Sequence, residues 1–75
     1  MSTPLTILLN GQQRTLNHLE SPSVLSLVIS ALELKADRIA VEHNGEIVTR
    51  ATWAEAQITD GDRLEIVHFV GGGLE

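Results

Sequence analysis

The sequence predicts an α+β fold, a small mixed sheet of four to five strands with one main helix across one face. Three observations support this prediction. Two Asn-Gly dipeptides each mark a tight hairpin, because both central positions of a type I′ turn require positive φ. A single segment has the clear periodicity of an amphipathic helix. The 75 residues suffice for one small domain with a modest core.

The first half of the sheet is predicted from an aliphatic run and the first Asn-Gly pair. Leu5 to Leu9 is expected to be a strand, and Asn10-Gly11 turns the chain back through residues 12–17. The alternation of apolar and polar residues over 12–17 is weak. We therefore expect this second strand to lie at an edge of the sheet.

The main helix is predicted over residues 23–33. Ser21 or Ser23 can cap its free N–H groups, and Pro22 fits a first helical turn because its missing N–H has no partner there. One face of this helix is aliphatic and is expected to be core. It contains Val24, Leu25, Val28 and Leu32, flanked by Leu27, Ile29 and Ala31.

The second half of the chain predicts another hairpin and a final strand. Residues 39–43 and 46–48 flank the second Asn-Gly pair. A turn or short helix carries Trp53, which we expect to be a core or cover residue that closes one end of the sheet. A tight turn over 59–62 leads into the last strand, 63–70. The connection over the helix should bring a later strand beside the first. This order is the β-grasp arrangement, the architecture of ubiquitin.

Charges in the last strand indicate which of its faces points to water. Arg63 and Glu65 mark the exposed face, so the residues between them should point to the core. If the strand stays regular, Val67 and Phe69 are exposed as well; if it twists or bulges, Phe69 packs under the helix. Exposed apolar groups so close to a glycine run predict a docking patch for a partner, formed by Val67, Phe69 and Val70.

Composition argues against several classes of function. The net charge is −5 and the five Lys and Arg side chains are scattered, so neither nucleic acid nor an anionic membrane is an expected partner. The chain has no cysteine, which removes thiol nucleophiles and disulfides. Neither a membrane-spanning run nor a signal peptide is recognisable, so a cytoplasmic location is expected.

No arrangement of side chains in the sequence is typical of a catalytic or metal site. His18, His43 and His68 lie in separate predicted elements without ligand-like spacing. Asp60 and Asp62 flank a glycine, but a turn explains them better than a calcium loop. We expect no bound metal or cofactor, and no enzymatic activity of the chain on its own.

The run Gly71-Gly72-Gly73 is typical of a linker when it is taken alone. Its position changes this interpretation. Placed after the last strand of a small domain, it would form a tail thin enough to enter another protein's active site. If Gly73 were the last residue, its α-carboxylate would be the reactive group that the tail delivers.

The chain resembles the ThiS family, the sulfur carrier proteins of thiamine biosynthesis, over nearly its whole length to Gly73. The most specific match is residues 60–73, Asp-Gly-Asp-Arg-Leu-Glu-Ile-Val-His-Phe-Val-Gly-Gly-Gly; residues 41–48, Arg50 and Trp53 fit at the right spacing. Two features depart from the family. Thr49 stands where relatives commonly have proline, and Leu74-Glu75 follow the glycines with which the family ends.

These features divide the chain into a β-grasp domain at 1–70, a flexible glycine tail at 71–73 and two further residues at 74–75. We expect Leu74-Glu75 to be a scar of expression cloning. The alternative is a native precursor from which these two residues are clipped.

The resemblance implies a function for the tail. The carboxylate of Gly73 would be adenylated by an ATP-dependent, ThiF-like adenylyltransferase, and sulfur drawn from cysteine by a desulfurase would convert it to a thiocarboxylate. A ThiG-like thiazole synthase would then use that sulfur to build the thiazole ring of thiamine. Gly71 and Gly72 would let the tail pass through narrow channels in these partners. The chain itself would bind no ATP and would be a monomer when alone.

Three alternatives stay open on the sequence. The chain resembles, less specifically, other β-grasp sulfur carriers such as the small subunit of molybdopterin synthase. It could instead be a ubiquitin-like modifier that joins its glycine to lysines, although Lys35 is the single lysine available for self-linked chains. The third alternative is a plain binding module with an inert tail.

Overall fold

Both Asn-Gly dipeptides form the predicted hairpin turns. In a computed structural model, which describes residues 4–69, β1 (Pro4–Leu9) and β2 (Gln12–Glu20) flank the first turn. The second turn joins β4 (Ile39–His43) to β5 (Glu46–Val48). The first residue of each turn has positive φ, 51° and 52°, which asparagine adopts more readily than most residues. The hairpins are therefore as predicted, except that β2 continues beyond residue 17.

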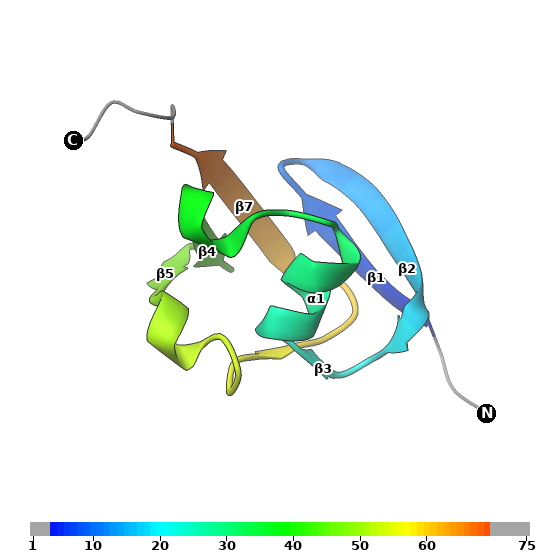
Figure 1. The fold of residues 1–75 in the computed structure, drawn as a ribbon. Coiled ribbons are helices and arrows are strands. Elements are labelled where there is room, and N and C mark those ends of the chain that lie inside the picture. Colours follow the sequence, from blue (N-terminus) through cyan, green and yellow to red (C-terminus); the bar gives the residue numbers. More distant parts are fainter. Residues whose placement is uncertain (1–3, 70–75) are drawn as a thin grey trace.

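The strands form a mixed five-stranded sheet in the order β2-β1-β7-β4-β5 (Figure 1). The last strand, β7 (Arg63–His68), lies in the centre. It runs parallel to β1 and antiparallel to β4. The weakly alternating strand β2 lies at an edge, as predicted. With one α-helix across one face, this confirms the predicted β-grasp architecture.

A second, two-stranded sheet replaces the predicted start of the helix. β3 (Ser23–Val24) pairs antiparallel with β6 (Gln57–Ile58), and α1 (Leu25–Ala31) begins directly after β3. The prediction of a helix over 23–33 was therefore too long at both ends. Pairing with a segment far along the chain determines the conformation of residues 23 and 24, and local helix signals cannot reveal that pairing.

The predicted serine cap was also wrong. No side chain caps α1. Its first N–H groups donate instead to backbone carbonyl groups of the segment after β5: Leu25 N–H to Ala56 O at 2.8 Å, and Ser26 N–H to Trp53 O at 3.1 Å. These bonds satisfy N–H groups that a helix start leaves without partners. Ser21 lies elsewhere, where its Oγ accepts a hydrogen bond from Asp60 N–H at 3.0 Å.

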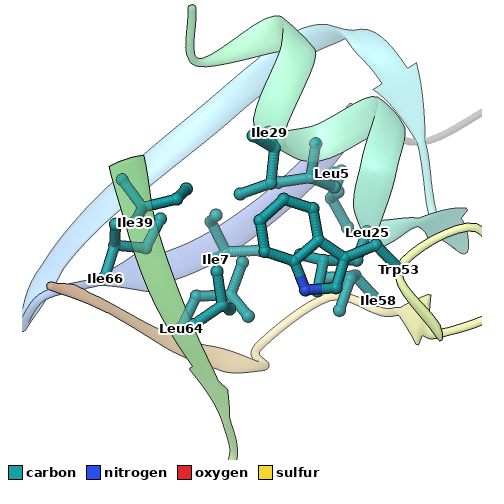
Figure 2. Packing of buried hydrophobic residues seen from close by; sticks show 11 residues of the cluster. Leu5, Ile7, Leu25, Ile29, Ile39, Trp53, Ile58, Leu64 and Ile66 are labelled. Carbon is teal, nitrogen blue, oxygen red and sulfur yellow. The ribbon is translucent and has the colours of Figure 1, made fainter. Parts of the chain in front are cut away.

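The core lies between the sheet and α1, and Trp53 is part of it (Figure 2). Trp53 follows the short 3-10 helix η2 (Arg50–Thr52), and its indole N–H donates to Val48 O at 3.0 Å. Of the two predicted roles, core or cover residue, Trp53 thus has the first, because it is buried within the core cluster. The buried hydrophobic residues are Leu5, Ile7, Leu25, Val28, Ile29, Ile39, Val41, Trp53, Ile58, Leu64 and Ile66.

Two of the residues that flank the predicted aliphatic helix face are exposed. Leu27 and Ala31 point away from the core, whereas Leu25, Val28 and Ile29 are buried as predicted. The connection after α1 contains a second 3-10 helix, η1 (Ala36–Arg38). None of the helices within residues 4–69 has the length and apolar character needed to cross a membrane.

Candidate functional site

β7 is the strand from which the sequence continues into the glycine run, and it is held on both sides. β1 pairs with its first two residues, Arg63 and Leu64, and β4 pairs with residues 64–68. The pairing extends past the end of the strand, since Phe69 N–H donates to Arg38 O at 2.8 Å. Backbone hydrogen bonds therefore hold the chain as far as Phe69, the last described residue. Val70, Gly71, Gly72 and Gly73 lie outside the described residues, so their roles stay predictions.

Asn10 extends the contact between β1 and β7 beyond the end of β1. Its backbone N–H donates to Leu64 O at 2.9 Å. Its side chain then takes the place of a further strand residue: Oδ1 accepts from Ile66 N–H at 2.7 Å, and Nδ2 donates to Ile66 O at 3.3 Å. The amide thus provides both a donor and an acceptor to the edge of β7, which would otherwise lack partners there.

Asn44 holds the start of β7 from the opposite side. Its backbone N–H donates to Arg63 O and its Oδ1 accepts from Arg63 N–H, both at 2.8 Å. The Asn-Gly pairs predicted a turn at each asparagine but not these side-chain bonds. Asparagine at the first turn position is the only signal for them, and the same signal occurs in hairpins where the amide points to solvent.

A polar cluster fixes the turn that precedes β7. His43 Nε2 lies 2.7 Å from Asp62 Oδ2, and Asn44 Nδ2 donates to Asp62 Oδ1 at 3.2 Å. Partial burial alone would raise the pKa of Asp62. Hydrogen bonds from Thr59 N–H, His43 and Asn44, with the charge of His43, together outweigh burial and hold that pKa below its ordinary value of 3.8. The cluster stabilises the turn.

The three histidines do not come together. His18 and His68 are exposed on different strands, and His43 contacts Asp62. Within residues 4–69, no group of three or more His, Cys, Asp or Glu side chains is placed to hold a metal ion. Asp60 takes part in the turn, because its Oδ1 accepts from Thr6 N–H at 2.8 Å.

The side of the sheet that faces away from α1, here called the outer face, carries the exposed apolar residues near the tail. Val67 is 60% exposed and Phe69 49% exposed, so the regular-strand alternative is correct and Phe69 does not pack under the helix. Leu8 of β1 and Ile47 of β5 are exposed as well. That these two residues share a face with the last strand follows from the strand order, which the sequence pattern alone does not reveal.

Comparisons with known proteins point to one family. The profile of the ThiS family matches residues 7–73. A crystal structure of the thiamine biosynthesis protein ThiS from Geobacter metallireducens superimposes with a TM-score of 0.78 at 30% identity, covering 92% of this chain and 100% of that one. The sulfur carrier protein ThiS of Bacillus subtilis is 39% identical over 46 residues, which cover 61% of this chain and 70% of that protein.

Other relatives are much longer proteins. A thiazole synthase from Paramagnetospirillum magneticum is 33% identical over 71 residues, covering 95% of this chain but 21% of the synthase. The chain thus spans about a fifth of the length of the thiazole synthases that it matches.

Proposed function

The chain belongs to the ThiS family, and we propose that it is a sulfur carrier for the synthesis of the thiamine thiazole. One observation carries the proposal beyond family membership. The central strand of the sheet, held by β1, β4 and two asparagine side chains, continues in the sequence through Phe69 and Val70 into three glycines. Such a domain is suited to present a narrow tail whose terminal carboxylate is the reactive group.

Three chemical steps would load the carrier. An ATP-dependent, ThiF-like adenylyltransferase would join the Gly73 carboxylate to AMP and release pyrophosphate, because a free carboxylate is a poor electrophile. A persulfide that a cysteine desulfurase forms on a sulfur donor would then displace AMP and give an acyl persulfide. A thiol, such as that of excess cysteine, would reduce its S–S bond, which leaves the thiocarboxylate on Gly73 and forms a disulfide. The absence of cysteine from the chain is compatible with this chemistry, since the sulfur would be held at the chain terminus.

The outer face and the glycines would have separate roles in transfer. Val67 and Phe69, both exposed beside the end of β7, would dock on the partners together with Val70. Gly71 and Gly72 would occupy the narrow channel that leads to the reacting centre, where a Cβ atom would clash. The acceptor of the sulfur would be a ThiG-like thiazole synthase, which is consistent with the match to longer proteins of that name.

The position of Gly73 sets a chemical condition. In the sequence given, Leu74 follows Gly73, so the Gly73 carboxyl group is part of an amide bond. Loading requires that this bond be absent or cleaved. The experiment therefore compares a chain that ends at Gly73 with the chain that ends at Glu75.

The test is the intact mass of each chain after incubation with ATP, the adenylyltransferase, the desulfurase and cysteine. We expect the chain ending at Gly73 to gain the mass of one oxygen-to-sulfur exchange, and the longer chain to stay unchanged unless it is first clipped after Gly73. A stable adduct on a lysine of another protein would instead support a modifier. An unchanged mass for both chains would support a plain binding module and contradict the proposal.

A further inference from the structure

The outer face gathers most of the exposed apolar side chains that the structure describes. Five large hydrophobic residues are exposed among residues 4–69, and four of them lie on this face: Leu8, Ile47, Val67 and Phe69. The fifth, Leu27, is on α1. Because α1 and the core occupy the other side of the sheet, no described element covers the outer face (Figure 1). Exposed apolar residues gathered in this way mark a contact surface for another protein.

Two carboxylates face each other within this apolar surface. Glu42 of β4 and Glu65 of β7 are directly opposite in the antiparallel register, which places their Cβ atoms about 5 Å apart. The next pair of these strands on the outer face is Ala40 with Val67, and Ile47 of β5 lies beside Glu42. The glutamate pair is therefore bordered by apolar side chains.

Neither glutamate is neutralised within the described part of the chain. The ion pair found among residues 4–69 is His43 with Asp62, and it does not include Glu42 or Glu65. Arg63 lies on the same face of β7 but forms no ion pair there. Like charges directly opposite each other destabilise a sheet. A partner that supplies positive charge would turn this unfavourable pair into a favourable contact.

The negative charge of Glu42 and Glu65 also decides whether a second copy of the chain or a basic partner fits the outer face better. A second copy packed face to face would bring four carboxylates together, a like-charge contact that opposes association. A partner surface with a cation among apolar side chains would complement both features of the face. Arginine fits best, because its planar guanidinium can donate to two carboxylates at once and is weakly hydrated.

We propose that the outer face docks an apolar surface of the thiazole synthase, and that an arginine of the synthase binds between Glu42 and Glu65. The identity of the partner rests on the proposed function, whereas the chemistry of the contact rests on the strand register and exposure. The glutamate pair then has two effects. It disfavours self-association of an otherwise apolar face, and it selects a basic partner.

The experiment measures binding of the chain ending at Gly73 to the thiazole synthase of the same organism, by calorimetry at low and high salt. We expect Glu42→Gln/Glu65→Gln to weaken binding about tenfold at low salt and to reduce its salt dependence. The control Glu33→Gln/Glu55→Gln removes the same charge from outside this face and should bind like the wild type. Ile47→Ser should weaken binding without changing the salt dependence.

Thermal unfolding checks that the variants fold, and Glu42→Gln/Glu65→Gln should melt no lower than the wild type because a repulsive pair is removed. Equal loss of affinity in the two double variants would contradict the proposal, since net charge alone would then explain the effect. Dimerisation of the wild type that is lost in Ile47→Ser would also contradict it, because the face would then bind a second copy.

The two proposals can fail separately. The binding assay uses an unloaded chain and does not depend on formation of the thiocarboxylate. If loading fails while Glu42→Gln/Glu65→Gln binds the synthase more weakly than the wild type does, the sulfur-carrier proposal is wrong and the docking proposal stands. If loading succeeds while that variant binds like the wild type at both salt concentrations, the docking proposal is wrong.

Discussion

At the residue scale, each of the two turn asparagines has two roles, and glycine could fill only the first of them. Both adopt positive φ, and both use their side-chain amides to hold the backbone of β7. The positive φ was predictable from the Asn-Gly pairs, whereas the amide bonds depend on which strand lies next to each turn. Asn10 is the better test, because its two side-chain bonds join residues far apart in the sequence.

Asn10→Gly should separate these two properties. Glycine keeps the turn conformation without strain but removes both bonds to Ile66. We expect the free energy of unfolding to fall by about 1–2 kcal/mol, measured by urea denaturation. Asn17→Ala, at an exposed position of β2, is the control and should change stability by less than about 0.5 kcal/mol. Equal effects of the two substitutions would show that the amide bonds contribute nothing.

Asp62 gives a prediction that depends on pH. Its pKa is lower in the folded chain than its ordinary value of 3.8, so its contribution to stability is complete above that value. The contribution is lost as the pH falls through the folded-state pKa. Asp62→Asn should therefore be less stable than the wild type by about 1 kcal/mol at pH 7. The difference should shrink as the pH is lowered below 3.8, and a difference independent of pH would contradict this account.

At the element scale, α1 shows what periodicity can and cannot predict. The spacing of aliphatic residues predicted the helix and most of its buried face. It did not predict the ends, since pairing of β3 with β6 sets the start. The helix ends at Ala31, and two residues later Glu33 has a φ of 60°. There Glu33 N–H donates to Ser30 O at 3.0 Å and Leu34 N–H to Ile29 O at 3.2 Å, a Schellman motif without its usual glycine.

Glu33→Gly should therefore stabilise the domain. Glycine has no Cβ to oppose the left-handed conformation, which costs other residues about 1–2 kcal/mol. Part of this gain is lost because glycine makes the unfolded chain more flexible, so we expect a net stabilisation of about 0.5–1 kcal/mol. Thermal and urea unfolding would measure it. A lower stability of the variant would mean that the Glu33 side chain makes a contribution larger than the relief of strain.

In the sheet too, the sequence of one strand predicts which of its residues are exposed but not which residues lie opposite them. Alternation along β7 predicted that Val67 would be exposed, and the structure confirms it. The pairing of Glu42 with Glu65, by contrast, follows from the register between β4 and β7. Side-chain alternation gives the face of each strand but not its neighbour. The candidate docking surface was therefore predicted only where it lies on a single strand.

At the scale of the whole molecule, all the elements depend on one small core. The buried cluster joins α1, the sheet and Trp53, and a domain of this size has little stability in reserve. Leu25→Ala, at a residue with no exposed surface, should lower the free energy of unfolding by about 2–5 kcal/mol and reduce the melting temperature strongly.

Leu27→Ala is the matched control on the same helix, because Leu27 is 52% exposed. It should change the melting temperature little. Circular dichroism would follow both variants. If Leu25→Ala and Leu27→Ala unfolded at similar temperatures, the assignment of buried and exposed helix faces would be wrong.

The central claim is that this domain carries sulfur on its terminal glycine to a thiazole synthase, and labelled sulfur tests it most directly. The chain ending at Gly73 is loaded from isotopically labelled cysteine, purified, and mixed with the thiazole synthase and its other substrates. The account predicts labelled sulfur in the thiazole product. It also predicts that Gly72→Val folds normally but yields no labelled product. Unlabelled thiazole, or full transfer from Gly72→Val, would contradict the account.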